Sequence, residues 1–144
     1  MEVPFETTLF VRDTCLCFHL QRAARALARR FDEALRPIGL TSWQYSMMMA
    51  LNQPAPPSMS LVASVLGADR TTLTAALKPL QRRRLVTVTV DANDRRNRRL
   101  ALTPAGRALL ARAVPVWRRT HADIDGMLPR GGADRLRRDL RAVT

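Results

Sequence analysis

Residues 59–80 read MSLVASVLGADRTTLTAALKPL and have the spacing of two short helices that meet at a tight turn. Ala63 is small enough to let the helices cross closely. Gly67, four residues later, can adopt the left-handed backbone that the turn requires. The positions that such a unit buries are all apolar, namely Val62, Leu66, Ala68, Leu73 and Ala76. The stretch therefore predicts a helix-turn-helix, which serves either to read DNA or as a plain packing corner.

The second helix of this unit, about Asp69–Arg83, has one face that carries no carboxylate. Asp69 is placed to cap the helix, and its leucines repeat at the spacing of a buried stripe. The outward positions are Arg70, Thr71, Thr72, Thr74, Ala75 and Lys78. Arginine can bind guanine in a bidentate manner, threonine can contact base edges or a thymine methyl, and lysine suits phosphate. We therefore expect this face to contact DNA.

A β-hairpin follows, with strands at Leu85–Val90 and Arg98–Leu102 around the polar turn Asp91–Asn97. Nine basic side chains lie between positions 70 and 99, against Asp91 and Asp94 as the only acidic ones. The arginines expected to contact DNA from the hairpin are Arg95, Arg96 and Arg98. A hairpin of this kind can act as a wing, whose arginines enter the narrow minor groove where the negative potential is deepest.

Helical patterns flank this unit on both sides. One apolar stripe runs from Asp13 to about Arg36, and a capping box opens a second helix at Thr41. Residues 60–66 form the first helix of the helix-turn-helix. After the hairpin, Thr103 and Pro104 start a long helix that Pro115 should kink, and a short last helix follows residues 129–132. The expected order is α-α-α-α-β-β-α-α, a mainly α protein with a small β-hairpin.

The composition limits the function classes. The 144 residues carry a formal charge of +12, with 23 arginines and a single lysine, and 47% of them are apolar. The chain can therefore bury a core, and its charge indicates a polyanionic partner. It has no phosphate-binding glycine loop and no metal-ligand cluster, and its only histidines are His19 and His121. We expect no catalysis, no cofactor and no bound metal.

The same sequence argues against a membrane or secreted protein. No apolar stretch approaches the roughly 20 residues that span a bilayer. Glu2 and Glu6 lie where a signal peptide would be basic. Cys15 and Cys17, the only cysteines, are too close in sequence to staple distant segments. These features predict a reduced, cytoplasmic protein.

Residues 91–106, DANDRRNRRLALTPAG, resemble the wing and the start of the following helix in the MarR (multiple antibiotic resistance regulator) family. The resemblance covers roughly residues 13–128 and implies a dimeric winged helix transcription factor. It assigns wing-tip roles to Asp94 and Arg96, with Arg96 in the minor groove. The family usually has glycine where this chain has Arg84, so a left-handed backbone there would cost about 1 kcal/mol.

The resemblance also implies an organisation of the chain. We expect an N-terminal dimerisation helix in residues 1–40 and a winged helix-turn-helix, here named the reading head, in residues 41–103. Residues 104–144 would supply C-terminal dimerisation helices, which with the first helix bury their stripes against a second copy.

Two candidate sensors follow. Leu16-Cys17-Phe18 resembles the organic hydroperoxide resistance regulators, although Phe31 and Ser42 stand where that branch has tyrosines. Cys17 is either such a thiol, activated by nearby basic groups, or a small buried core residue. A Cys15–Cys17 disulfide is disfavoured if both residues lie in one helix, and Cys15, Cys17 and His19 lack a fourth metal ligand.

The other sensor is a crevice between the dimer helices and the reading head. Its candidate ligand-binding residues are His19, Arg22, Trp43 and Met47, of which the aromatic and the methionine could equally be core. MarR regulators usually respond to small phenolic or carboxylate ligands or to oxidants.

We therefore expect a homodimeric, sequence-specific regulator that binds a pseudo-palindromic operator in double-stranded DNA. It would be a repressor that a small aromatic or anionic inducer releases. The alternatives are a peroxide-sensing repressor that uses Cys17 and a non-specific architectural nucleic-acid binder.

Overall fold

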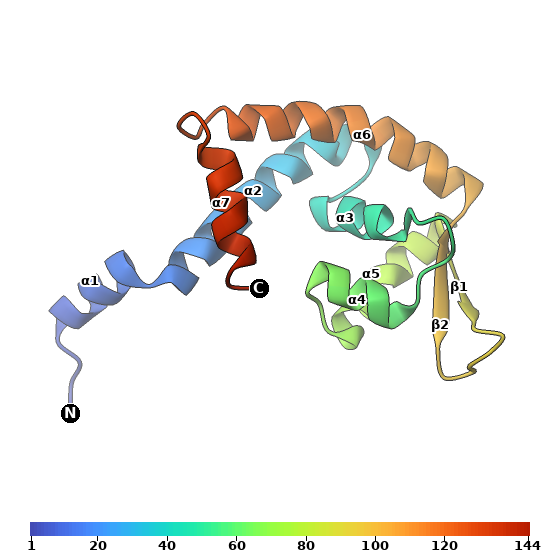
Figure 1. Ribbon diagram of the computed structural model, residues 1–144, viewed down its shortest axis with the longest axis horizontal. Coiled ribbons are helices and arrows are strands. Elements are labelled where there is room, and N and C mark those ends of the chain that lie inside the picture. Colours follow the sequence, from blue (N-terminus) through green and yellow to red (C-terminus); the bar gives the residue numbers. More distant parts are fainter.

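The computed structural model describes residues 1–144 and contains seven α-helices and one two-stranded antiparallel sheet (Figure 1). The helices are α1 (Phe5–Thr14), α2 (Leu16–Leu35), α3 (Ser42–Leu51), α4 (Met59–Leu66), α5 (Arg70–Arg82), α6 (Pro104–Asp125) and α7 (Gly132–Arg141). The strands are β1 (Val86–Val90) and β2 (Arg98–Leu102), and a 3-10 turn, Arg36–Ile38, links α2 to α3. The predicted mainly helical, winged helix-turn-helix fold is confirmed, with one helix more than expected.

The helix-turn-helix forms as the spacing predicts. Gly67 ends α4 in the left-handed conformation (φ 60°, ψ 31°), and Ala63 is buried where α4 and α5 meet. Asp69 caps α5 by accepting a hydrogen bond of 2.7 Å from the backbone amide of Thr72. The side chains of Leu73, Leu77 and Leu80 on α5 are 0–1% exposed. Their burial fixes which face of α5 points outward.

The hairpin pairs in register from Val86 opposite Leu102 to Val90 opposite Arg98. The proline-rich connector before α4 extends this sheet, because the amide of Leu100 donates to the carbonyl of Pro57 at 3.0 Å and Ser58 bridges to Arg99. Leu100 is fully buried in the core of the reading head. The wing is therefore anchored on both sides.

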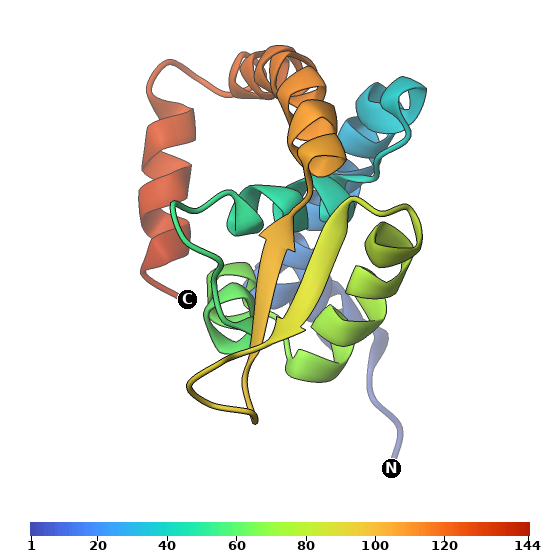
Figure 2. The same ribbon diagram turned by 90° about the vertical axis from the view of Figure 1, so that its right-hand side faces the viewer.

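A second layer of helices lies over the reading head (Figures 1 and 2). Helix α6 runs without interruption through Pro115 and packs along α2, where Phe31 and Trp117 stack with ring centroids 6.5 Å apart. The Arg137–Asp125 ion pair ties α7 back to α6. None of the seven helices combines the length and apolar character needed to cross a membrane.

The N-terminal region differs from the prediction. Instead of one helix from Asp13, the chain forms α1 and breaks at Cys15, whose backbone is extended (φ −70°, ψ 106°). The Cys15 sulfur accepts the amide of Phe18 at 3.4 Å and so caps α2. The prediction missed the break because no proline or glycine marks it, and missed α1 because its apolar residues form no single stripe.

Candidate nucleic-acid interface and adjoining cavity

The outward face of α5 is exposed and includes a shallow hollow. Helix α5 lies beside the hairpin (Figure 2). The hollow is lined by Arg70, Thr71, Thr74, Ala75 and Lys78. Thr72 is exposed at the start of the same helix. The structure thus brings five of the six expected α5 residues together in one hollow, with cations at both ends and threonines between them.

Two of the three threonines already donate hydrogen bonds within the helix. The hydroxyl of Thr72 donates to Asp69 Oδ2 at 2.7 Å, and that of Thr74 donates to the carbonyl of Arg70 at 2.7 Å. Only Thr71 has no hydrogen bond from its hydroxyl. Thr71 can therefore both donate to and accept from a base edge, whereas Thr72 and Thr74 offer a lone pair or a methyl group.

The tip of the wing is organised by Asp94. Its carboxylate accepts the backbone amide of Arg96 at 3.0 Å and the side-chain amide of Asn97 at 3.1 Å. Arg98 turns back and donates to the carbonyl of Arg95 at 3.0 Å. The guanidinium groups of Arg95 and Arg96 are exposed and pair with no group of the chain. Two free cations therefore project from a turn whose backbone is already fixed.

The base of the wing is closed by Asp91, which is only 6% exposed. It accepts the amide of Asn93 at 2.8 Å and Nε of Arg99 at 2.6 Å, and these contacts hold the pKa of its carboxyl below the ordinary value. Arg99 also donates to the carbonyl of Pro56 at 3.3 Å. Arg99 is therefore a structural link between the wing and the connector, a role that its position in a basic run concealed.

The junction between α5, β1 and α6 has two tight positions. Arg84 adopts the left-handed conformation (φ 57°), as its place before Leu85 predicts, and its carbonyl accepts the hydroxyl of Thr103 at 2.8 Å. A Cβ atom on Gly106 would lie 2.1 Å from the Leu85 carbonyl oxygen. The close packing of Gly106 on the Leu85 carbonyl and the left-handed backbone of Arg84 together fix the orientation of the wing relative to α6.

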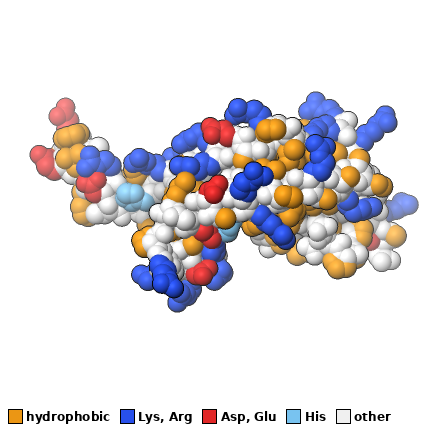
Figure 3. All heavy atoms as spheres, turned by 90° about the horizontal axis from the view of Figure 1, so that it is seen from above, with side chains coloured by type: hydrophobic (Ala, Val, Ile, Leu, Met, Phe, Trp, Pro, Cys, Tyr) orange, Lys and Arg blue, Asp and Glu red, His pale blue; other side chains and the backbone are white.

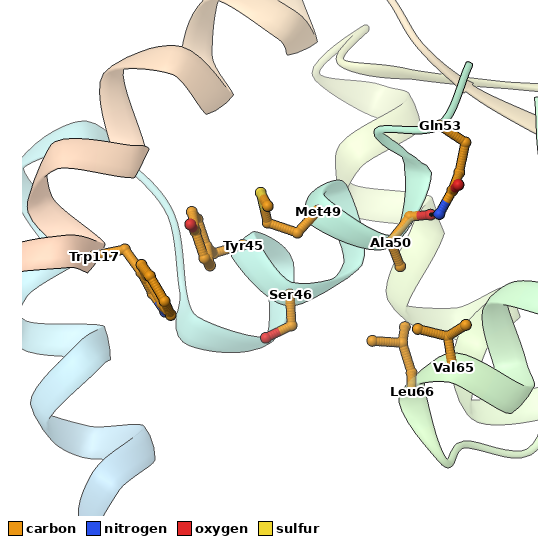
Figure 4. A pocket seen from close by; sticks show the side chains of 8 residues that line it. All are labelled: Tyr45, Ser46, Met49, Ala50, Gln53, Val65, Leu66 and Trp117. Atoms are coloured by element: carbon orange, nitrogen blue, oxygen red, sulfur yellow. Dashed lines mark hydrogen bonds between the residues drawn. The ribbon is translucent and has the colours of Figure 1, made fainter. Parts of the chain in front are cut away.

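A cavity of about 400 Å³ opens between α3, α4 and α6 (Figure 4). It is lined by Tyr45, Ser46, Met49, Ala50, Gln53, Val65, Leu66 and Trp117. The rings of Tyr45 and Trp117 stack 6.1 Å apart on one side of it. Burial raises the pKa of Tyr45, and the positive charge of nearby Arg118 partly offsets that rise. The cavity is an apolar site with a few polar groups, which is the usual composition of a small-molecule site.

The four residues expected to bind a ligand do not line this cavity. Met47 is fully buried in the core, and Trp43, although 37% exposed, lies outside the cavity lining. His19 and Arg22 lie exposed on the N-terminal half of α2. On α3, the cavity is lined by Tyr45 and Met49, which are one turn apart, rather than by Trp43 and Met47.

The two cysteines lie at the break between α1 and α2, and both are free. Cys17 is exposed, and its sulfur accepts Gln21 Nε2 at 3.3 Å, so within one chain it is not a core residue. Cys15 is not inside a helix, so the steric argument against a Cys15–Cys17 disulfide does not apply. No group of three or more potential ligands lies close enough to hold a metal ion.

Comparison with known proteins connects this geometry to regulators of transcription. A sequence model described as the MarR family matches residues 38–97. The M. tuberculosis transcriptional regulator MosR, solved in complex with DNA, is 40% identical; the match covers 90% of this chain and 92% of that one, with a TM-score of 0.81. The transcriptional repressor CouR, bound to a 23-mer DNA duplex, is 29% identical over 99% of each chain, also with a TM-score of 0.81.

Two further matches concern ligands and curated relatives. CouR from Rhodococcus jostii RHA1 has been solved with p-coumaroyl-CoA, and that chain is 27% identical over 91% of this chain and 92% of its own, with a TM-score of 0.76. The HTH-type transcriptional regulator SarZ of Staphylococcus epidermidis is 27% identical over 92 residues, or 64% of this chain. That match spans 62% of the length of SarZ.

Proposed function

Because this chain belongs to the MarR family of winged helix transcription regulators and is not an enzyme, we propose that it represses transcription by binding operator DNA as a homodimer. The observation that carries this proposal is the α5 face, where Arg70 and Lys78 are exposed with no carboxylate between them, together with the exposed, unpaired Arg95 and Arg96 of the wing. Figure 2 shows α5 and the wing on the same side of the molecule. A regulator that binds operator DNA would act in the cytoplasm.

Each element has a distinct role in this proposal. Helix α5 enters the major groove, where Arg70 binds a guanine edge and Thr71 contacts the neighbouring base. Lys78 neutralises a phosphate. Arg95 and Arg96 enter the adjoining minor groove, and the hydrogen bonds of Asp94 hold the turn from which they project.

The second copy would cover apolar side chains that one chain leaves open. Leu16 on α2 is 61% exposed, Met127 after α6 is 56% exposed, and Leu136 on α7 is 45% exposed. A two-fold dimer through α2, α6 and α7 buries these residues and presents two reading heads. Half-sites about one helical turn apart follow from this arrangement.

An inducer would bind in the cavity between α3, α4 and α6. Tyr45 and Trp117 suit an aromatic ring, and Arg118, whose positive charge acts on Tyr45, suits an anionic group of the same ligand. The p-coumaroyl-CoA found in CouR has both features. Because the cavity separates the reading head from α6, a ligand there can change the spacing of the two α5 helices and release the operator.

The test is selection of bound duplexes from random DNA, followed by affinity measurements on the selected site. Arg96→Ala should weaken binding and Arg70→Ala should also relax base preference, whereas Arg130→Ala, in the exposed loop before α7, should leave both unchanged. Equal affinity for a scrambled duplex would instead identify a non-specific architectural binder. Wild-type affinity of both variants would refute the assigned contacts.

A second candidate signal is oxidation, because the Cys17 thiol is exposed at the start of α2. Peroxide and aromatic acids should be added separately to the operator complexes of the wild type and Cys17→Ser. If peroxide releases the wild type, but not Cys17→Ser, from the operator, the thiol is the sensor. If the aromatic acid releases both proteins and peroxide releases neither, the cavity is the sensor.

A further inference from the structure

Helix α1 is an apolar segment that the chain itself leaves uncovered. None of its residues is buried, and Phe5, Phe10 and Val11 are 70%, 66% and 50% exposed. Figure 1 shows it extending from the far end of α2, away from the reading head. Exposing two phenylalanines on a ten-residue helix is unfavourable in water, so this segment requires a partner surface.

The uncovered cavity lies at the opposite end of α2. Phe31, near the C-terminal end of α2, stacks on Trp117, which also lines the cavity. At about 1.5 Å per residue, α2 spans about 20 Å from Leu16 to Phe31, so even the near end of α1 lies at least that far from the cavity of its own chain. The direction in which α1 leaves Cys15 increases that separation (Figure 1).

Two-fold symmetry removes this separation. In an isologous dimer whose axis crosses α2 at about a right angle, the two copies of α2 run antiparallel, so the N-terminal end of one lies beside the C-terminal end of the other. The α1 of each protomer then reaches the region of Phe31 and Trp117 in its partner.

The two surfaces also match in chemistry. Residues 1–14, here named the arm, contain Glu2, Glu6 and Asp13 but only one basic side chain, Arg12. The arm is therefore net acidic in a chain whose formal charge is +12. Figure 3 shows the acidic side chains of this arm apart from the basic side chains of the body. Arg118, whose charge acts on the cavity residue Tyr45, forms no ion pair. Val65 and Met49, which line the cavity, are 60% and 39% exposed.

We propose that α1 of one protomer covers the cavity of its partner, with Phe5 and Phe10 against Met49 and Val65 and the acidic groups of the arm toward Arg118. The inference rests on the proposed dimer and deepens it, because the inducer site is then completed by the second chain. A ligand enters or leaves only when α1 moves, so the arm regulates access to the site.

Cross-linking between chains tests the placement. In a Cys15→Ser, Cys17→Ser background, Thr8→Cys on α1 and Ser64→Cys on α4 leave the apolar contacts intact, since both positions are exposed. A short bismaleimide added to the mixed single variants should give a covalent dimer joined between residues 8 and 64. Pairing Thr8→Cys with Ala92→Cys on the wing should give none. A chain that carries both Thr8→Cys and Ser64→Cys should not be linked within itself. Such an intrachain link, or the absence of any link between the mixed chains, would overturn the proposal.

Dye binding tests the covering. The Phe5→Ser, Phe10→Ser double variant should bind the apolar dye 8-anilinonaphthalene-1-sulfonate several-fold more tightly than the wild type, because the cavity is opened. Val90→Ser, which removes an exposed apolar side chain from the hairpin, should not. Unchanged dye binding in the double variant contradicts the inference. Light scattering and operator binding are measured on the same proteins. A monomer, or a protein that binds no operator, would refute the proposed function. A dimer that binds operator but shows unchanged dye binding would refute only the placement of α1.

Discussion

Nε of Arg99 donates to Oδ2 of Asp91 at 2.6 Å and joins the two strands at the base of the wing. The same guanidinium reaches the carbonyl of Pro56, so one side chain holds strand, turn and connector together. The exposed arginines at the tip project from this fixed base.

This contact predicts an acid dependence of stability. The amide of Asn93 and the Arg99 guanidinium lower the pKa of Asp91, so its stabilising effect is complete above the ordinary aspartate value of about 3.9 and is lost as the pH falls through the lower folded-state pKa. Asp91→Asn should therefore reduce the free energy of unfolding at pH 7, and the difference from wild type should shrink below about pH 4. Urea unfolding across this range measures it, with the exposed Asp123→Asn as control. A difference that stays constant with pH would contradict the assignment.

Arg84 provides a prediction of increased stability. Its left-handed backbone (φ 57°) is one that glycine adopts without strain. Arg84→Gly should raise the free energy of unfolding by about 1 kcal/mol and the melting temperature by about 3 °C. Arg84→Ala removes the same charge but keeps the Cβ atom, so it should give no such gain. Equal melting temperatures for the two variants would show that the backbone is not strained.

Gly106 should not tolerate even one methyl group. The Cβ of Gly106→Ala would meet the Leu85 carbonyl oxygen at 2.1 Å, so α6 or β1 must shift, at a cost of about 1–3 kcal/mol. Gly126→Ala, at the C-terminal end of α6, meets no atom closer than 3.4 Å and should be neutral or mildly stabilising. Thermal unfolding of both variants gives the comparison. A neutral Gly106→Ala would mean that the junction is not closely packed.

The free arginines of the wing predict a salt effect. Because Arg95 brings one positive charge to the minor groove of each half-site, Arg95→Ala should lower the slope of log affinity against log salt by about 2 for the dimer. Arg99→Ala should weaken binding by loosening the wing, with a smaller change in slope. Titrations at several salt concentrations separate the two effects, with Arg130→Ala as the unchanged reference. A flat dependence in the wild type would argue against the electrostatic account as a whole.

The parts of the fold that could be predicted are those that local chemistry determines. Gly67 at the turn, Asp69 at the start of α5 and the capping box at Thr41 act within a few residues, and all three appear as expected. The left-handed backbone of Arg84 was predictable for a different reason, because the resemblance placed this residue where the family usually has glycine.

The parts that could not be predicted depend on side-chain direction or on distant contacts. The break at Cys15 has no sequence marker, and the commitment of Thr72 and Thr74 to their own helix depends on rotamers. The cavity is made by three helices, so the sequence of α3 alone could not show that Tyr45 and Met49 face the opening. Arg99 was grouped with the DNA-facing basic run because its carboxylate partner lies eight residues away.

Lys78 is the only lysine of the chain, and it lies exposed on α5. Apart from the N-terminal amine, an amine-selective acylating reagent therefore has a single target, at one end of the proposed DNA-contacting hollow. An amine-reactive label becomes a footprint of operator occupancy, read from the mass of one peptide. Enzymatic acetylation of the same nitrogen would remove one positive charge from α5 of each protomer and so weaken its contact with DNA. Because the chain has no other lysine, lysine acetylation can act only at this contact.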